Sequence, residues 1–161
     1  MSSEATLEKA PIDPQDYMRV LQGLTLKNVA LVSCKAESER QAVRELMSKT
    51  AKLSVSVQDQ ASFRAESAGL IIVEHNYSIT SKSGRKKILS IAASFDVEFE
   101  ALEGFDAGFF EAFKELSLRL ITWPYVRELV ASMTSRMDLP RLQLGLWRVP
   151  FGRGTAEGEE A

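Results

Sequence analysis

Apolar residues in the last third of the chain recur three or four positions apart, which is the spacing of one face of an α-helix. Between Thr122 and Met137 the residues on this face are Val126, Leu129, Val130, Met133 and Met137. Thr122 predicts the N-cap of this main helix, and Pro124 lies in its first turn, where a missing N–H costs little. Asp138 and Pro140 predict its end, because a residue before proline is pushed out of the helical region.

After this helix the apolar residues alternate with other residues, a period of two that is typical of an extended segment with one apolar side. Leu142, Leu144 and Leu146 form the apolar set, and Arg141 and Gln143 lie between them. The pattern predicts a short strand or an extended arm behind the helix.

Four segments in the first hundred or so residues alternate in the same way and predict β-strands. They are residues 26–35, 53–63, 69–81 and 89–102. The first segment is apolar on both sides near its middle, so we expect it to be covered on both faces. Ser83-Gly84 predicts a tight hairpin between the last two strands. Strands followed by helices favour an α+β fold, with a four-stranded antiparallel sheet packed by a long C-terminal helix.

Three further segments have helical character. Asp13-Pro14 looks like a cap followed by a first-turn proline, and apolar residues at helical spacing continue to about Leu24, so a short N-terminal helix is expected. Residues 36–52 fit either a brief helix or a long loop. A helix beginning near Asp106 is expected to reach the main helix through a junction before Thr122.

Length and composition indicate a single domain. A chain of 161 residues is long enough to bury a substantial core. Its 45% hydrophobic and 26% charged residues are the balance of an ordinary soluble protein. We expect a flexible tail at 1–12, one domain at 13–149, and a disordered tail rich in glycine and acidic residues at 150–161.

The net charge of −2 gives no electrostatic argument for nucleic acid or anionic membrane as a partner. Cys34 is the only cysteine, so an internal disulfide is excluded. The N-terminus has no apolar core for a signal peptide, and no run approaches the roughly 18 apolar residues of a membrane-spanning helix. A cytoplasmic protein without membrane insertion is therefore expected.

Little in the sequence suggests catalysis. His75, the only histidine, falls in a predicted strand and is expected at a surface or partly buried position rather than as a base. Cys34 is expected to be a packed thiol. The alternating carboxylates Asp96, Glu98 and Glu100 fit a solvated strand face better than a cation site. Without a phosphate-binding loop, a dinucleotide-binding glycine pattern or a metal-ligand cluster, we expect no catalytic residue, cofactor or metal.

Large aromatic side chains gather around the main helix and the arm. They are Phe105, Phe109, Phe110, Phe113, Trp123, Tyr125 and Trp147. One sheet and one main helix bury only some of these rings, so the others are expected to line a subunit interface or an open groove. Such a groove beside an open strand edge can hold non-native polypeptide. The residues expected to contact that polypeptide are Phe109, Phe110, Phe113, Trp123, Leu142, Leu144 and Trp147.

The main helix and the arm also carry a motif. Trp-Pro-Tyr-x-Arg-Glu followed by Ser-Arg-x-x-x-Pro-x-Leu-x-Leu resembles the signature of the SecB family of protein-export chaperones. The matching residues are Pro124, Tyr125, Arg127, Glu128, Ser135, Arg136, Pro140, Leu142 and Leu144. The resemblance implies the same sheet-and-helix fold, here with an added N-terminal helix. It also implies structural roles, as ion-pair or cap residues, for Arg127, Glu128 and Arg136.

The resemblance further implies a function. SecB-like proteins hold unfolded precursor chains in apolar grooves without ATP, assemble as dimers or dimers of dimers, and in export-type members pass the precursor to the SecA motor. The expected function is therefore an ATP-independent, oligomeric holding chaperone. The alternative is a dedicated adaptor for one partner, such as the antitoxin of a toxin–antitoxin system, because solitary SecB-like chaperones share the extra N-terminal helix.

The chain departs from export-type members at two points. The predicted first strand carries no acidic residue over Leu26–Val32, where export-type members present acidic residues for SecA. The arm is followed by glycines instead of an amphipathic helix that would cover the groove. Both departures favour general holding of unfolded chains over transfer to SecA.

Overall fold

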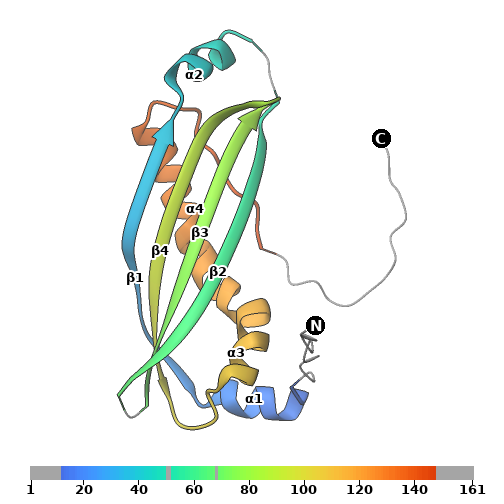
Figure 1. Cartoon of the computed structure of the whole chain (residues 1–161), viewed down its shortest axis with the longest axis vertical. Helices are drawn as coiled ribbons and strands as arrows, with labels where there is room; N and C mark the ends of the chain where they lie inside the picture. The colour runs from blue at the N-terminus through green and yellow to red at the C-terminus, as the bar shows by residue number, and fades with distance from the viewer. Residues whose placement is uncertain (1–11, 50–51, 68, 148–161) are drawn as a thin grey trace, which may run out of the picture.

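The computed structural model describes residues 12–49, 52–67 and 69–147. The two predicted tails, 1–12 and 150–161, therefore lie outside the described residues except for Ile12. In chain order the elements are α1 (Pro14–Gln22), β1 (Leu24–Ser38), α2 (Arg40–Met47), β2 (Ser54–Ser67), β3 (Leu70–Ser83), β4 (Lys86–Ala101), α3 (Ala107–Phe113), a π-helical turn (Lys114–Leu118) and α4 (Arg119–Arg136). Figure 1 shows one curved sheet with α3 and α4 crossing one of its faces.

The four strands form one antiparallel sheet in the order β1-β4-β3-β2, which confirms the predicted fold class. The predicted hairpin joins β3 to β4, and Gly84 adopts a positive φ of 59° in its turn. The open alternative at 36–52 resolves to a helix, α2, at one end of the sheet. The two central strands, β3 and β4, bury alternate side chains, as expected when one face packs against helices.

The helical layer is more continuous than the sequence predicts. Asp106 caps α3, since its Oδ1 accepts from the Phe109 amide at 2.8 Å, as expected. From there α3, the π-helical turn and α4 follow without a break and make a helix of thirty residues. The predicted N-cap at Thr122 is therefore wrong. Thr122 lies inside α4, fully buried, with its hydroxyl 3.1 Å from the Leu118 carbonyl oxygen.

Two core clusters divide the space between the sheet and the helical layer. The first joins α1 and α3 to one end of the sheet, and the second joins α4 to the other end. In α4 the predicted apolar face is confirmed, because Val126, Leu129 and Val130 are buried, and Met133 and Met137 pack against the second cluster. Each end of the sheet is thus stabilised by a different part of the long helix.

The prediction that the first strand is covered on both faces is wrong. No residue of β1 is fully buried. Leu26 pairs with Phe99 and Leu31 with Phe95, so these leucines lie on the inner face of the sheet with the two buried rings. Each leucine is nevertheless 46% exposed. The reason is geometric: the helical layer runs obliquely over the sheet and leaves part of β1 uncovered (Figure 1).

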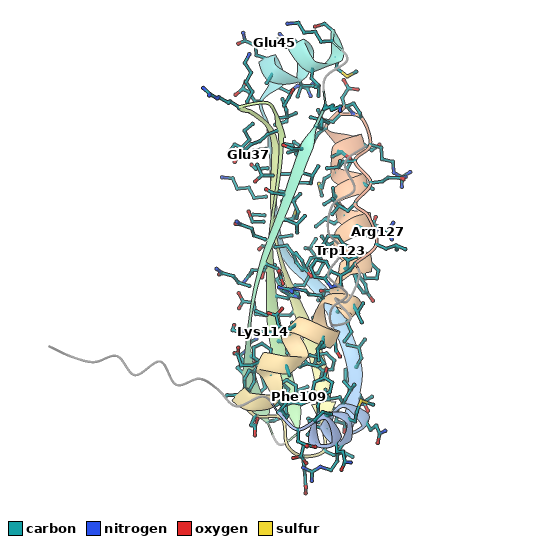
Figure 2. The ribbon with its side chains drawn as sticks, turned by 90° about the vertical axis from the view of Figure 1, so that its right-hand side faces the viewer. Glu37, Glu45, Phe109, Lys114, Trp123 and Arg127 are labelled. Carbon is teal, nitrogen blue, oxygen red and sulfur yellow. The ribbon has the colours of Figure 1, made fainter. Side chains whose placement is uncertain are left out.

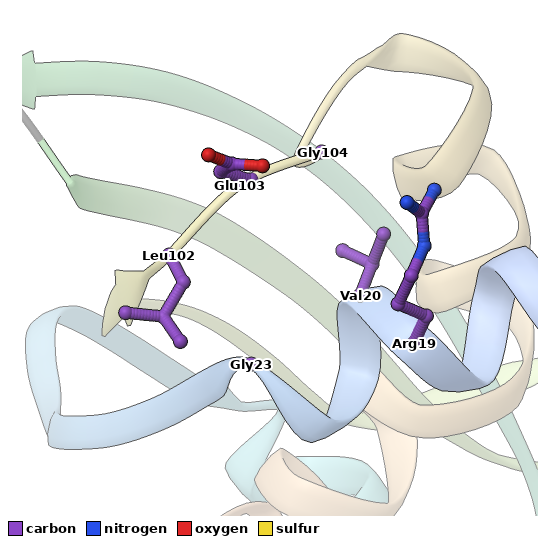
Figure 3. A pocket seen from close by; sticks show the side chains of 6 residues that line it. All are labelled: Arg19, Val20, Gly23, Leu102, Glu103 and Gly104. Atoms are coloured by element: carbon purple, nitrogen blue, oxygen red, sulfur yellow. The ribbon is translucent and has the colours of Figure 1, made fainter.

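The predicted N-terminal helix is present as α1. Asp13 caps it by accepting from the Gln15 amide at 2.8 Å. The Tyr17 ring stacks on Phe109 at 5.2 Å between centroids, which ties α1 to α3. Figure 3 shows the turn after β4 passing over α1, where Gly104 adopts a positive φ of 80° beside Val20. A β-carbon at Gly104 would lie 2.8 Å from Val20 Cγ2.

Gly104→Ala is expected to destabilise the protein by about 2–4 kcal/mol, because the new methyl meets Val20 and the residue must keep a positive φ. Gly84→Ala is the matched control. It imposes the same kind of strain at φ 59°, but its methyl meets nothing within 4 Å, so a loss of about 1–2 kcal/mol is expected. Urea unfolding of both variants measures the difference, and equal losses would contradict tight packing of α1 against this turn.

Candidate functional site

The segment behind α4 forms an extended arm, residues 139–147. The chain reverses at Asp138, whose φ is 55°, and the Leu139 amide donates to the Thr134 carbonyl at 3.0 Å. The helix therefore ends where the sequence predicts. The arm then runs back along α4 and pairs with no strand of the described sheet (Figure 1).

The side chains of α4 hold the arm by its backbone. Trp123 Nε1 donates to the Gly145 carbonyl and Arg127 Nε to the Leu144 carbonyl, each at 2.8 Å. Thr134 Oγ1 accepts from the Leu142 amide at 3.1 Å. Figure 2 shows Trp123 and Arg127 close together on the same part of α4. Because these bonds use only backbone atoms of the arm, they do not depend on which side chains the arm carries.

The side chains of the arm alternate only in part. Leu144 is buried, with 7% of its surface exposed, and Leu142 packs beside it against the second core cluster. Leu146, the next apolar residue in the period of two, is 74% exposed. The Trp147 ring lies edge-on to Trp123 at 5.4 Å between centroids. The structure thus brings together four of the seven residues expected to contact polypeptide: Trp123, Leu142, Leu144 and Trp147.

The other three expected contact residues lie elsewhere. Phe109, Phe110 and Phe113 are almost completely buried in the first core cluster, among α1, α3 and one end of the sheet. Figure 2 shows Phe109 at the opposite end of the helical layer from α2. Tyr17 of α1 covers Phe109, while Phe110 and Phe113 pack against rings of the sheet and of the turn after β4. We therefore leave them out of the binding surface considered below.

The remaining motif residues are mostly at the surface. Pro124, Tyr125, Glu128, Ser135, Arg136 and Pro140 are all exposed. Among the described residues none of Arg127, Glu128 and Arg136 forms an ion pair. Arg127 has a different structural role, as the donor to the arm, and Arg136 Nε lies 3.4 Å from Ser132 Oγ.

A buried polar network lies beside Trp123, and sequence reasoning missed it. His75 has no exposed surface, so its expected surface or partly buried position is wrong. Its Nε2 donates to Asp59 Oδ2 at 2.8 Å, and its Nδ1 lies 3.0 Å from the Thr122 hydroxyl. That hydroxyl is also 2.7 Å from the Tyr77 hydroxyl. The only sequence signal is a histidine on the apolar side of a strand's alternation, which is common in cores.

The network continues to the surface through Arg119. Arg119 binds Asp59 through two hydrogen bonds, of 2.9 and 3.0 Å, and Glu115 through one of 2.8 Å. Its guanidinium carbon also lies 5.0 Å from the centre of the Trp147 ring. One arginine therefore joins the edge strand β2, the helix α4 and the end of the arm.

Burial and pairing set the protonation of this network. Burial lowers the pKa of His75, and it outweighs the opposing effect of Asp59. Burial would raise the pKa of Asp59, but hydrogen bonds from Arg119 and His75 together lower it below its ordinary value. Burial also raises the pKa of Tyr77 to about 12. Near neutral pH the ring of His75 is therefore neutral between the Asp59 carboxylate and the Thr122 hydroxyl.

The hydrogen bonds from Thr122 through His75 to Asp59 have the connectivity of a catalytic triad, but these residues are closed to substrate. Thr122 and His75 both have 0% of their surface exposed, so no substrate reaches the hydroxyl or the ring. The arrangement instead satisfies polar groups inside the core and joins three elements.

Other parts of the described surface carry little chemistry. Figure 3 shows a hollow between α1 and the turn after β4, lined by two exposed charged residues, Arg19 and Glu103, beside Val20 and Leu102. Residues 12–49, 52–67 and 69–147 contain no cluster of histidine, cysteine and carboxylate groups arranged to hold a metal. Within the same residues, no helix has the length and apolar character needed to cross a membrane.

Comparison with solved structures identifies the class of fold. The chain superposes on a SecB-like chaperone of Mycobacterium tuberculosis, solved in complex with a ChAD peptide from the HigA1 antitoxin. The TM-score is 0.69 at 16% identity, over 85% of this chain and 99% of that one. A protein of unknown function from Streptococcus agalactiae gives a TM-score of 0.38 at 15% identity, over 76% of this chain and 97% of that one. No protein-family model and no curated protein matches the sequence. The fold is SecB-like, as the motif predicts.

The buried histidine makes stability depend on pH. As the pH falls below about 6.5, the unfolded chain takes up a proton at His75 that the folded chain refuses, because the folded pKa is lower. Stability is therefore complete above about pH 6.5 and falls toward acid, by up to about 1.4 kcal/mol per pH unit. The depressed pKa of Asp59 adds a further loss once the pH falls below about 4.

His75→Gln removes the titrating group and keeps an amide that can hydrogen-bond. Since the chain has one histidine, this variant is expected to flatten the fall of unfolding free energy between pH 7.5 and 5.5. Urea unfolding at several pH values gives the slope for each protein. An unchanged slope in the variant would show that another group is responsible.

Proposed function

We propose that this protein is an ATP-independent chaperone that holds unfolded polypeptides, including precursors for export, and that it acts without catalysis. The observation that carries the proposal is a SecB-like fold whose sheet and helix leave apolar side chains uncovered. A holding chaperone needs such a surface, because unfolded chains share exposed apolar residues and free backbone groups rather than a sequence.

The uncovered apolar residues lie on both layers of the described chain. On the sheet they include Leu26, Leu31 and Val32 of β1. On the long helix, Leu116 and Leu120 are one turn apart and both are more than 40% exposed. In addition, β1 and β2 are the two edges of the sheet, so each has backbone groups available to an extended segment. These features suit the capture of non-native polypeptide.

A second copy of the chain is the proposed partner at the β1 edge. Fifteen residues of β1 have no neighbour on one side within the described sheet, and its inner leucines lie open beside the helix. Two identical edges can meet about a twofold axis, which pairs the backbones and covers the leucines together. We therefore propose that the protein assembles as a dimer or a dimer of dimers.

Leu31→Glu is expected to shift the assembly toward monomers, because it places a charge on the surface that the second copy would cover. Met47→Glu is the matched control, since Met47 is a large exposed apolar residue on α2, away from β1. Light scattering coupled to size exclusion gives the mass of each variant. A wild-type monomer, or equal masses for both variants, would contradict pairing through β1.

A dedicated adaptor is the second candidate function. The structurally similar mycobacterial protein was solved with a peptide from an antitoxin, which favours one specific partner of that kind. The range of clients separates the two functions, since a holding chaperone binds many unfolded chains and an adaptor binds one. Of the functions considered, only export would involve transfer of clients to SecA.

The direct test is light scattering from an aggregation-prone protein during refolding, without nucleotide. A holding chaperone is expected to suppress scattering at near-stoichiometric ratios, because each captured chain occupies one groove. An equal concentration of an inert protein is the control for crowding. If scattering is not suppressed, the dedicated adaptor is the better reading, and the partner is then sought by affinity capture from the source cell.

A further inference from the structure

The arm has the features of a segment that another polypeptide can replace on α4. Its three hydrogen bonds to α4 side chains engage only the backbone of residues 142–145. The arm gains no strand pairing within the described sheet, and Leu146 points largely into solvent. The buried Nε1 of Trp147 finds no acceptor among the described residues. An unpaired buried donor is unfavourable, so this end of the arm carries an energetic cost where it lies.

Two of the three receiving side chains, Trp123 and Thr134, also have contacts outside the arm. Trp123, Arg127 and Thr134 are four and seven positions apart, so they share one stripe of α4. The Trp123 ring also packs against Tyr77, with 6.2 Å between centroids. The Thr134 hydroxyl also lies 2.9 Å from the Val130 carbonyl oxygen. Trp123 and Thr134 are therefore expected to keep their positions when the arm leaves, and Arg127 stays between them on the same stripe as a second donor.

We propose that this stripe of α4 is a polypeptide-binding groove, and that residues 141–147 occupy it in the free protein as a stand-in for the client. An extended client segment with apolar residues two apart displaces the arm. Its carbonyl groups accept from Trp123 and Arg127, and one apolar side chain takes the place of Leu144. This inference rests on the proposed chaperone function and assigns its binding surface.

The assignment changes the role of the expected contact residues. Trp123 belongs to the receiving surface, whereas Leu142, Leu144 and Trp147 belong to the occupant. The arm competes with the client at the high effective concentration of a tethered segment. Loosening the arm therefore strengthens client binding, because it raises the fraction of open grooves. If the three arm residues contacted the client directly, their loss would weaken binding instead.

The test uses a fluorescent peptide with the sequence of residues 141–147, because that segment is known to fit the groove. Anisotropy measures its binding to the full chain. Leu144→Ala is expected to bind the peptide about tenfold more tightly than the wild type, since the arm loses its buried side chain. Leu146→Ala is the matched control, two residues further along the arm and exposed, and is expected to leave the affinity unchanged.

A second substitution tests the receiving side. Adding Arg127→Ala to Leu144→Ala is expected to weaken peptide binding about tenfold, because the arm is already loosened and one of the two donors is lost. A third measurement needs no variant. Saturating the wild-type chain with the same peptide carrying phenylalanine for tryptophan is expected to shift tryptophan emission to longer wavelength, as Trp147 moves into water.

Unchanged or weaker peptide binding by folded Leu144→Ala would overturn the inference, and so would an unshifted emission in the saturated wild type. Refolding of an aggregation-prone protein separates this failure from that of the chaperone proposal. Suppressed scattering without arm exchange would support the chaperone function and contradict the proposed groove. Tighter peptide binding without suppressed scattering would support the groove and contradict a general holding function.

Discussion

The pairing of Asp59 with Arg119 fixes how the long helix lies on the sheet. Asp59 is on an edge strand and also accepts from the buried ring of His75. Moving α4 along the sheet would separate the charges of Arg119 and Asp59, which are mostly withdrawn from water. Removing one partner of such a pair leaves the other charge poorly hydrated and without its counter-ion. Trp123 and Arg127 follow Arg119 at steps of four residues, on the same stripe of the helix. The network therefore also fixes the side chains that receive the arm.

The sequence predicts the elements of the fold well because each has its own periodic signal. The strand alternation and the spacing from Val126 to Met137 report which side chains share a face. They do not report what covers that face, which is why the pattern of β1 wrongly predicts a strand covered on both faces. The same limit applies to Phe109, which Tyr17 of α1 covers. The position of the arm, but not its hydrogen bonds to α4, follows from the pattern of leucines.

The polar core was beyond sequence reasoning for a different reason. Threonine is a common N-cap residue, and an N-cap is predicted from nearby residues alone. In the structure its hydroxyl meets His75 and Tyr77, which lie more than forty positions earlier in the chain, and these contacts keep Thr122 inside a continuous helix. A histidine without visible partners in sequence looks like a surface residue. Its two hydrogen-bond partners come from another strand and a helix, so only the folded chain brings them together.

A single helical layer over four strands leaves a fold with more apolar surface than it can cover. Along β1 the described chain leaves part of that surface uncovered, whereas beside α4 the arm covers it. The two places differ in how they can be used. An open edge is available to another chain at once, but an occupied groove opens only at the cost of displacing its own segment. Because the arm is tethered, it occupies the groove at a high effective concentration, and under the proposed function its fit at Leu144 sets how readily a client displaces it.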